Sequence, residues 1–275
     1  MKRWSGKVVV VTGGSAGLGR SIASTFAHAG ATTILLARDE SRLSRARDWI
    51  DPENDLPVHS IVCDVCDTTS IQDAVTTIRD QFGRIDVWVN NVGVSIRTRF
   101  DECPIDEYQR LMEINFMTAV RCSYAVLPLI SQSSGSIVNI GSLAAKTGWK
   151  NVSPYATSKH ALAAFSHQLR LEGPANVHTL FVCCGPIKRN DEGTRYADAS
   201  SNVDEQAQSA GAGVRLKGID PDVLSSRIEV AVRKRKKELM IPWYARILFA
   251  IQQLSPTIGD WMLSKFNRSK SKNES

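Results

Sequence analysis

The sequence predicts an α/β fold of three layers, in which a mainly parallel β-sheet lies between two layers of helices. Short runs rich in β-branched residues alternate with helical sequence along most of the 275 residues. This alternation is typical of βαβ units, whose strands are buried on both faces. In addition, 43% of the side chains are apolar, which is enough for one sizeable core at this length. We therefore expect a single domain.

Six apolar runs are predicted to be buried strands, and a short seventh strand follows closer to the C-terminus. They occupy residues 8–11, 32–36, 58–63, 85–89, 136–140 and 177–182, with the seventh at 238–241. Helical patterns lie between them at residues 20–28, 70–82 and 107–131. Gly83 follows the second helix as a C-terminal stop, and Pro128 is expected to kink the end of the third.

The composition and periodicity of the sequence change after the sixth strand. Residues 188–218 are polar, small and glycine-containing, without a clear period, so we predict a mobile substrate lid over the strand ends. Asp220 and Pro221 then begin a helix. We take residues 1–242 as the main domain and residues 243–275 as an amphipathic, basic C-terminal helical extension.

Residues 243–266 of this extension place tryptophan, phenylalanine and leucine at helical spacing and flank them with lysine and arginine. That composition is typical of a helix lying in a membrane interface. The same pattern is expected of helices that pack on the protein's own core or on a second subunit. These interpretations stay open at the level of sequence.

The formal net charge of +6 is concentrated in two basic clusters, at residues 233–237 and 265–272. These clusters indicate either an anionic surface nearby, lipid or nucleic acid, or simply solvated helix ends. Nucleic acid is the least favoured partner. The first strand begins directly after MKRWSG, and no apolar run reaches the roughly 18 residues that span a bilayer. We therefore expect a cytoplasmic protein, soluble or at most peripheral on a membrane.

The six cysteines are predicted to be reduced thiols, mainly in the core. Cys63 and Cys66 have the C-x-x-C spacing found in metal and redox sites. No second ligand pair lies at zinc-like spacing, so the metal interpretation is the weaker one and no metal is expected.

The first strand ends in a glycine-rich turn, with Gly13, Gly17 and Gly19 between strand and helix. Residues without a Cβ atom allow the backbone and the helix N-terminus to approach a pyrophosphate closely, where amide donors and the helix dipole favour negative charge. A glycine triplet alone is a weak signal. Its position strengthens it, because open parallel sheets bind nucleotides at the first strand-to-helix junction.

Cofactor preference is predicted from the tip of the second strand, which carries Arg38 in place of an acidic residue. An acidic group there would bind the ribose hydroxyls of NAD, whereas an arginine pairs with the 2′-phosphate of NADP. NADP(H) is therefore favoured over NAD(H), although Asp39 and Arg42 can each alter the pocket. After the third strand, Asp64 can accept a hydrogen bond from the adenine amino group, or it can serve only as a turn residue.

Ser142 follows the fifth strand, and Tyr155 and Lys159 stand four residues apart at the start of an apolar helix. Side chains at this spacing project from the same helix face. A phenol with its ordinary pKa of about 10 is a poor proton carrier at neutral pH, and a nearby ammonium group lowers that pKa. Tyr155 is thus a candidate general acid in reduction and general base in oxidation. Ser142 can hydrogen-bond the reacting oxygen, and Asn115 can hold a water that connects Lys159 to solvent.

In these motifs the chain resembles the classical short-chain dehydrogenase/reductases. The resemblance spans roughly residues 5–190 and rests on Thr12, Gly13, Gly17 and Gly19, on Asn90, Asn91, Val92 and Gly93, and on Asn115, Ser142, Tyr155 and Lys159. It implies a Rossmann-like, doubly wound sheet of about seven strands. It also implies that the last four residues form a catalytic tetrad, that Lys159 holds the nicotinamide ribose, and that homodimers or homotetramers form through the helices carrying Asn115 and Tyr155.

The cofactor-binding residues that follow from the motifs and the resemblance are Gly13, Ser15, Gly17, Leu18, Gly19, Arg38, Asp64, Val65, Asn91, Gly93, Tyr155, Lys159 and Ile187. Three positions depart from the family pattern. Val92 replaces the usual alanine, Cys184 stands where the family has proline, and Arg189 lies near a threonine position that contacts the nicotinamide amide. Ile187 can still make a backbone contact there.

The sequence therefore predicts an NADP(H)-dependent oxidoreductase that interconverts a carbonyl and a secondary alcohol. Its substrate is predicted to be lipophilic, because the basic helix and amphipathic tail are similar to those of membrane-associated reductases of steroids or long-chain keto-lipids. The alternative is a cofactor-binding sensor or regulator that keeps the fold and uses its basic tail on a partner. The complete tetrad favours the enzyme.

Overall fold

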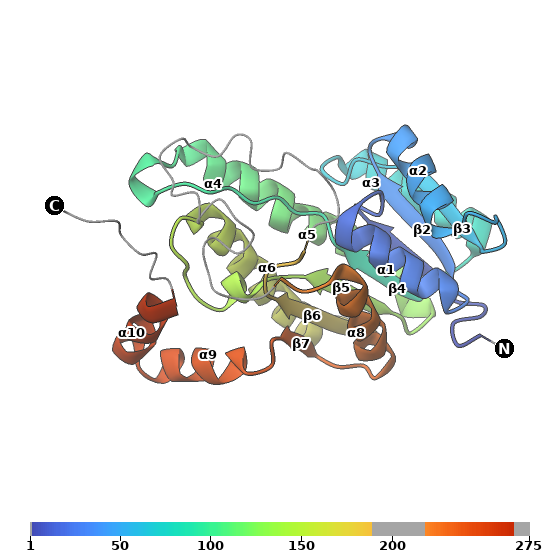
Figure 1. Ribbon diagram of the computed structural model, residues 1–275. Coiled ribbons are helices and arrows are strands. Elements are labelled where there is room, and N and C mark those ends of the chain that lie inside the picture. Colours follow the sequence, from blue (N-terminus) through green and yellow to red (C-terminus); the bar gives the residue numbers. More distant parts are fainter. Residues whose placement is uncertain (1, 189–217, 267–275) are drawn as a thin grey trace.

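The computed structural model describes residues 2–188 and 218–266, so that the predicted lid between them lies outside the described residues apart from its two ends. Within these ranges the chain forms one seven-stranded sheet in the order β3-β2-β1-β4-β5-β6-β7 (Figure 1). Every neighbouring pair of strands is parallel. The strands are β1 (Val8–Thr12), β2 (Thr32–Ala37), β3 (Val58–Val62), β4 (Val87–Asn90), β5 (Ser136–Ile140), β6 (His178–Cys184) and β7 (Glu238–Ile241).

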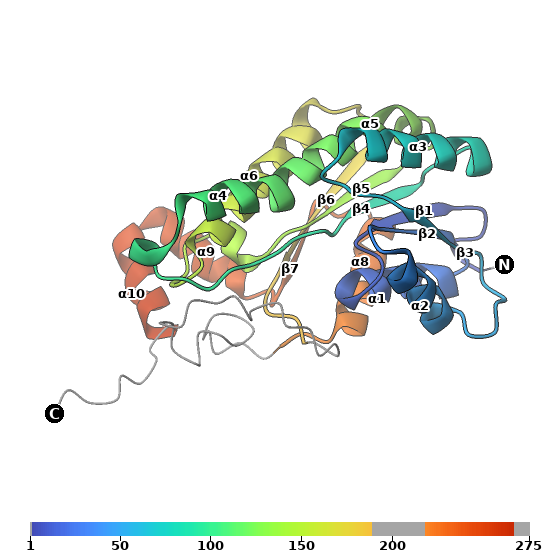
Figure 2. The ribbon, with the colours of Figure 1, turned by 90° about the horizontal axis from the view of Figure 1, so that it is seen from above.

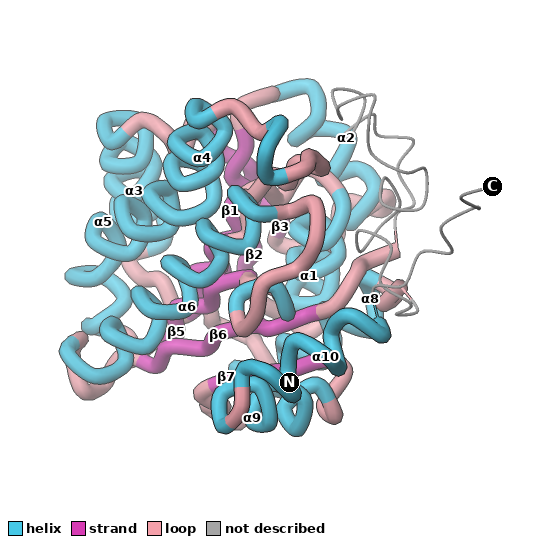
Figure 3. Tube along the Cα trace, turned by 90° about the vertical axis from the view of Figure 1, so that its left-hand side faces the viewer, coloured by secondary structure: helices cyan, strands magenta, loops and turns pink. Residues whose placement is uncertain are grey.

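Helices cover both faces of this sheet, which confirms the predicted three-layer, doubly wound α/β fold (Figure 2). One face carries α1 (Gly17–His28), α2 (Glu40–Ile50) and α8 (Pro221–Arg233). The other carries α3 (Thr68–Phe82), α5 (Thr118–Gln132) and α6 (Ser153–Glu172), and α4 (Ile105–Met112) packs against α6. Figure 3 shows the strands as the layer between the two sets of helices.

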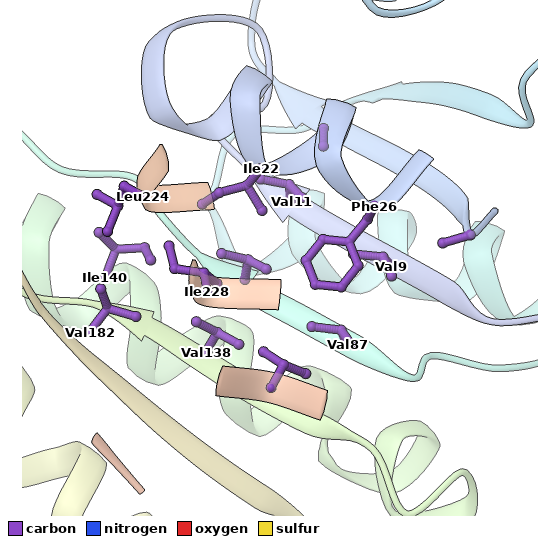
Figure 4. Packing of buried hydrophobic residues seen from close by; sticks show 14 of the residues in the cluster. Val9, Val11, Ile22, Phe26, Val87, Val138, Ile140, Val182, Leu224 and Ile228 are labelled. Carbon is purple, nitrogen blue, oxygen red and sulfur yellow. The ribbon is translucent and has the colours of Figure 1, made fainter. Parts of the chain in front are cut away.

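The core forms because alternate residues of each central strand point to opposite faces of the sheet. In β1, Val9 and Val11 pack with Phe26 of α1, as Figure 4 shows, while Val8 and Val10 belong to the cluster on the other face. All four valines are buried. A strand buried on both sides therefore needs a continuous run of β-branched residues, which is the pattern that predicts it in the sequence.

The strand order places a crevice at the carboxyl ends of β1 and β4. The chain runs outward from β1 to β2 and β3 on one side, and from β4 to β7 on the other. The loops that follow β1 and β4 therefore turn to opposite faces of the sheet. Ligands of open α/β sheets bind in the space between such loops.

Two expectations from the sequence were wrong in detail. The third strand is not buried on both faces, because β3 is the edge strand and Val62 is 53% exposed. The helix expected at residues 107–131 is not regular, because a π-helical segment, η2 (Glu113–Met117), separates α4 from α5. This irregular turn carries Asn115, and such turns occur frequently at functional sites.

The C-terminal part of the described chain consists of β7 followed by α9 (Ala245–Leu254) and α10 (Pro256–Phe266), which lie at the β7 end of the sheet in Figure 1. One face of α9 packs on the protein's own core, because Ala245 and Phe249 are buried in a cluster with Leu143. The exposed large apolar residues of this region are Trp243, Tyr244, Ile247, Leu254, Ile258 and Trp261.

A single run of helix among the described residues is long and apolar enough to cross a membrane. It spans Ile105–Gln132, and its most apolar window has a mean hydropathy of 1.3 and is 44% buried in the protein. Buried helices of soluble proteins pass the same test. This helix contains the π turn and packs on the sheet through α5, so its apolar face already has a partner.

Candidate functional site

A cavity of about 740 Å³ lies along the carboxyl ends of the central strands. Its wall contains most of the residues that the sequence assigns to cofactor or chemistry: Gly13, Ser15, Gly17, Leu18, Arg38, Asp64, Val65, Asn91, Gly93, Ser142, Tyr155, Lys159 and Ile187. Gly19 and Asn115 are outside the wall. Side chains scattered along the sequence are therefore gathered in one cleft.

The turn after β1 has the conformation that its glycines permit. Gly13 and Gly17 have positive φ angles of 63° and 53°, which side chains with a Cβ rarely adopt. A Cβ on Gly19 would lie 2.3 Å from the Gly13 carbonyl oxygen, so this position also requires glycine. No side chain caps the N-terminus of α1, and no acidic residue lies in its first turn. Its amide groups and positive dipole end therefore suit the pyrophosphate of a dinucleotide.

Asn91 holds the ends of β1 and β4 together behind this turn. Its side-chain amide donates to the carbonyl oxygen of Thr12 at 3.0 Å, and its backbone N–H donates to the Thr12 hydroxyl at the same distance. The Thr12 hydroxyl in turn donates to the carbonyl of Val89. These bonds fix the spacing of the two strand ends on either side of the crevice.

Arg38 projects from the tip of β2 with 76% of its side chain exposed, and its guanidinium group lies 4.0 Å from the carboxylate of Asp64. Asp39 also lines the cavity, and its carboxylate caps α2 by accepting bonds from the Ser41 hydroxyl and the Arg42 backbone N–H. These bonds also lower the pKa of the Asp39 carboxyl. Arg38 and Asp39 thus both line the cavity, and the carboxylate of Asp39 is engaged as the cap of α2.

Asp64, which the sequence places near the adenine as an expectation, has two local partners. One carboxylate oxygen accepts a bond from the Cys66 backbone N–H at 2.9 Å, and the other faces Arg38. The turn role is therefore present, and Asp64 also lines the cavity. Val65 beside it is buried and lines the same cavity.

Tyr155 and Lys159 lie on the first turns of α6, with the Lys159 ammonium nitrogen 5.9 Å from the centre of the Tyr155 ring. The lysine is buried, and its Nζ donates to the carbonyl oxygen of Ile140 at 2.9 Å. Burial lowers the pKa of Lys159 from 10.5 to about 8. A Cβ on Gly93 would approach this Nζ to 3.3 Å, so the glycine leaves space for the ammonium group.

Ser142 caps the short helix η3 (Leu143–Ala145) that follows β5. Its hydroxyl oxygen accepts a bond from the Ala144 backbone N–H at 3.1 Å. Because that bond uses the oxygen as an acceptor, the O–H can donate to a ligand in the cavity. The cap therefore orients the hydroxyl without consuming its donor.

Asn115 lies just behind the cavity and is buried in the π turn. Its carbonyl oxygen accepts from the Val94 backbone N–H at 2.7 Å, and its amide donates to the Val94 carbonyl and to the Ser158 hydroxyl, each at 2.9 Å. Since these bonds occupy the side chain, the predicted water would have to be held by the backbone of the turn. The side chain itself anchors the loop after β4.

Two of the departures from the family pattern, Cys184 and Arg189, lie at or after the end of β6 in the sequence. Cys184, at the end of β6, is buried and lines the cavity, and burial raises the pKa of its thiol to about 11. Ile187 lines the cavity and forms a bridge with Ile219, and Arg189 lies outside the described residues. Because its pKa is raised, the Cys184 side chain stays in the unreactive thiol form at neutral pH.

The cavity wall also contains Arg20 and Trp49, which sequence reasoning did not identify, and Arg97 and Trp149, which lie in two segments expected from the sequence to shape the pocket. Arg97 is buried, and its guanidinium group donates to the Ser95 hydroxyl at 2.6 Å. A backbone bond between Thr98 and Asn151 holds this segment against the loop before α6. These residues belong to no motif, so only the fold brings them to the site.

Comparison with known proteins places these features in context. Residues 7–199 match the family model for short chain dehydrogenases. The chain is 29% identical over 269 residues to a dehydrogenase/reductase SDR family protein 7-like of Drosophila melanogaster, covering 94% of this chain and 80% of that protein. It is also 29% identical over 280 residues to dehydrogenase/reductase SDR family member 7B of Mus musculus, covering 98% and 83%.

Two solved structures share the fold. A short-chain dehydrogenase from Streptomyces avermitilis aligns with a TM-score of 0.78 at 27% identity, covering 95% of this chain and 96% of that one. An alcohol dehydrogenase from Thermococcus sibiricus, solved in complex with 5-hydroxy-NADP, aligns with a TM-score of 0.72 at 21% identity, covering 86% and 95%.

Proposed function

Because this chain belongs to the short-chain dehydrogenase family, we propose that Tyr155 and Lys159 carry out its proton transfer. The chain is an oxidoreductase that acts on CH–OH groups with NAD(P). We take the cofactor to be NADP(H), and the reaction to be the interconversion of a carbonyl and a secondary alcohol on a lipophilic, steroid-like or keto-lipid-like compound.

The observation that carries this proposal is the buried ammonium group of Lys159 beside the Tyr155 ring. With a pKa of about 8, Lys159 is mostly protonated at neutral pH. A positive charge that is shielded from solvent favours the phenolate form of Tyr155 and thereby lowers the pKa of the phenol. The phenol can then donate its proton to the carbonyl oxygen in reduction and take it back in oxidation.

Bound NADP(H) would supply or accept the hydride, and the residues around it fit such a group. The glycine turn after β1 and the uncapped N-terminus of α1 suit the pyrophosphate, and Gly93 leaves room beside Lys159 for the ribose. The Ser142 hydroxyl, oriented by its bond from the Ala144 N–H, donates to the reacting oxygen. Tyr155 and Ser142 together would hold that oxygen while the proton moves.

The preference for NADP(H) rests on the strand tip of β2. Arg38 is exposed toward the cavity, and the neighbouring carboxylate of Asp39 is occupied as the cap of α2. An arginine there pairs with a 2′-phosphate, while the one acidic group next to it already accepts the capping bonds of α2. NADPH is expected to raise the melting temperature more than equimolar NADH, and Arg38→Ala to remove the difference. Equal shifts in the wild type would contradict the assignment.

A lipophilic substrate is proposed from the composition of the wall near Tyr155. The side chains there are mainly apolar: Leu143, Ala144, Trp149, Val152, Pro186 and Ile187. Apolar walls with a few oriented polar groups are typical of small-molecule sites. Leu143 and Trp149 also pack with Phe249 of α9, so the C-terminal helices support the same wall.

We further propose that the exposed face of the C-terminal helices touches a membrane surface. Trp243 is 71% and Trp261 58% exposed, and both lie close in sequence to the basic residues of the tail. Truncation before Trp243 would also remove Phe249 from the core, so substitutions are the cleaner test. Trp243→Ser with Trp261→Ser is expected to abolish flotation with anionic liposomes, while Val223→Ser on α8 does not. Absence of flotation by the wild type would exclude the membrane.

The oligomer is proposed to be a homodimer or homotetramer, formed through the α4–α5 and α6 helices. Family members typically oligomerise, and Tyr124 on α5 is an apolar side chain left 72% exposed. Light scattering coupled to gel filtration measures the mass directly. A monomer at micromolar concentration would contradict this part of the proposal.

The test of the proposed reaction is NADPH consumption with a panel of keto-steroids, 3-keto lipids and small aldehydes. The wild type is expected to turn over the lipophilic members, and Tyr155→Phe to lose turnover while it still binds the nucleotide. Nucleotide binding without turnover of any carbonyl would favour the alternative, a cofactor-binding sensor or regulator. Turnover by Tyr155→Phe at the wild-type rate would remove the phenol from the mechanism.

A further inference from the structure

A groove between α1, the tip of β2 and α2 forms the outer part of the cavity. Its wall contains three arginines, Arg20 of α1, Arg38 of β2 and Arg42 of α2. Of the carboxylates in the cavity wall, Asp39 caps α2 and Asp64 faces Arg38, and the third, Asp222, lies in the first turn of α8. The groove is therefore suited to an anionic group.

Arg20 has a defined position in this groove. Its guanidinium carbon lies 4.1 Å from the centre of the Trp49 ring, so that the aromatic face and the cation are stacked. Trp49 is half exposed, at 49%, and also lines the cavity. The contact joins α1 to α2 and restricts the arginine to one orientation.

The N–H groups of the Arg20 guanidinium have few hydrogen-bond partners within the protein. Its Nε is buried and has no hydrogen-bond partner in the structure, and no ion pair of Arg20 occurs within residues 2–188 and 218–266. Stacking uses the face of a guanidinium group and leaves its N–H groups in the plane, where they can bind two oxygens of one phosphate. The Nε atom is buried, so a ligand in the cavity would bind the terminal Nη groups of Arg20.

We propose that Arg20, held on Trp49, is a second guanidinium group for the 2′-phosphate of NADP(H), beside Arg38. This inference rests on the proposed preference for NADP(H). It assigns the specificity to a pair of arginines from two elements, with the tryptophan as the platform that positions one of them. Arg20 here is a binding residue and takes no part in the chemical step.

The inference is tested by calorimetric titration of the purified full chain with two small probes, 2′,5′-ADP and 5′-ADP. Of the two, only 2′,5′-ADP carries a 2′-phosphate. The dissociation constant of 5′-ADP divided by that of 2′,5′-ADP is therefore a measure of recognition of that group, and a lower ratio means weaker recognition. Arg20→Gln is expected to weaken 2′,5′-ADP by roughly 10- to 100-fold, the range for a lost charge-assisted hydrogen bond, and to leave 5′-ADP unchanged. Arg20→Lys, which keeps the charge without the planar fork, is expected to fall between Arg20→Gln and the wild type.

Two further variants sharpen the comparison. Trp49→Leu removes the platform and is expected to reduce the ratio less than Arg20→Gln does. Arg45→Ala is the matched control, because Arg45 is an exposed arginine of α2 that does not line the cavity. Its probe ratio is expected to equal that of the wild type.

The outcomes distinguish a failure of this inference from a failure of the proposed preference for NADP(H). If the wild type binds the two probes equally, the preference for NADP(H) is wrong and the role of Arg20 falls with it. If Arg38→Ala lowers the ratio but Arg20→Gln does not, the preference stands and the role of Arg20 is wrong. A parallel loss of both probes in Arg20→Gln would show that Arg20 supports the turn after β1, which also overturns its assignment to the 2′-phosphate.

Discussion

Replacing Lys159 by methionine is expected to stabilise the protein at neutral pH while it removes activity. The fall of the Lys159 pKa from 10.5 to about 8 measures how strongly burial disfavours the ammonium form. At about 1.4 kcal/mol for each pH unit, the cost to the folded state is about 3 kcal/mol below pH 8. The methionine has a similar length and carries no charge, so it removes this cost.

The hydrogen bond from Nζ to the Ile140 carbonyl is lost at the same time. A bond from a charged donor contributes about 2 kcal/mol, so a net gain of about 1 kcal/mol remains. For a chain of 275 residues that gain corresponds to a rise in Tm of roughly 2 °C. Greater stability at the expense of function is a frequent result of changing an active-site residue.

The dependence on pH isolates the charge. Above pH 8 the folded protein releases the Lys159 proton, whereas the unfolded chain keeps it up to about pH 10.5. The unfolded state then binds more protons, so the wild type gains stability as the pH rises, and the advantage of the variant decreases. Between pH 7 and pH 9.5 this advantage is expected to fall by about 2 kcal/mol.

The assay is urea unfolding of Lys159→Met and wild type across this pH range, without cofactor. Lys150→Met is the control, because Lys150 is an exposed lysine on the neighbouring loop. Its stability is expected to follow the wild type at every pH. A Lys159→Met variant that is no more stable at pH 7, or whose advantage does not change with pH, would refute the buried-ammonium argument.

Three further predictions concern the frame of the site. Gly19→Ala brings a Cβ to 2.3 Å from the Gly13 carbonyl, so we expect lower thermal stability and weaker nucleotide binding, while Gly148→Ala, with open space around it, changes neither. Asn115→Ala releases Val94, and hydrogen exchange at the Val94 amide is expected to accelerate; unchanged exchange would contradict the anchoring role. Phe249→Ala is expected to reduce the free energy of unfolding by about 3 to 5 kcal/mol in urea, and a loss below 1 kcal/mol would mean that α9 is not part of the core.

The sheet could be predicted from sequence because its strands are buried. In β1, β4 and β5 every residue is buried, and the apolar residues that dominate these strands mark them in the sequence. At the edge, β3 is half exposed and its pattern is mixed. The helix α2 was absent from the predicted helices, because only Leu43, Ala46 and Ile50 of its residues are buried and its composition is strongly polar.

The candidate site was predictable where motifs carry it, and hidden where contacts between distant elements create it. Tyr155 and Lys159 are one helical turn apart, so local geometry already joins them. The π turn at Asn115 depends on bonds to Val94 and Ser158, neither of which is its neighbour in the chain. The same holds for Arg20 on Trp49, a contact between two helices that no spacing in the sequence reveals.

The central claim is that Tyr155 supplies the proton while hydride passes between the nicotinamide cofactor and a carbonyl carbon. The most direct measurement uses NADPH that carries deuterium at both C4 positions, with the best ketone from the substrate panel and mass spectrometry of the alcohol product. The wild type is expected to place one deuterium on the carbinol carbon, and Tyr155→Phe to form no labelled alcohol although it binds the nucleotide with unchanged affinity. Labelled alcohol formed by Tyr155→Phe at the wild-type rate, or product without deuterium from the wild type, would contradict the account.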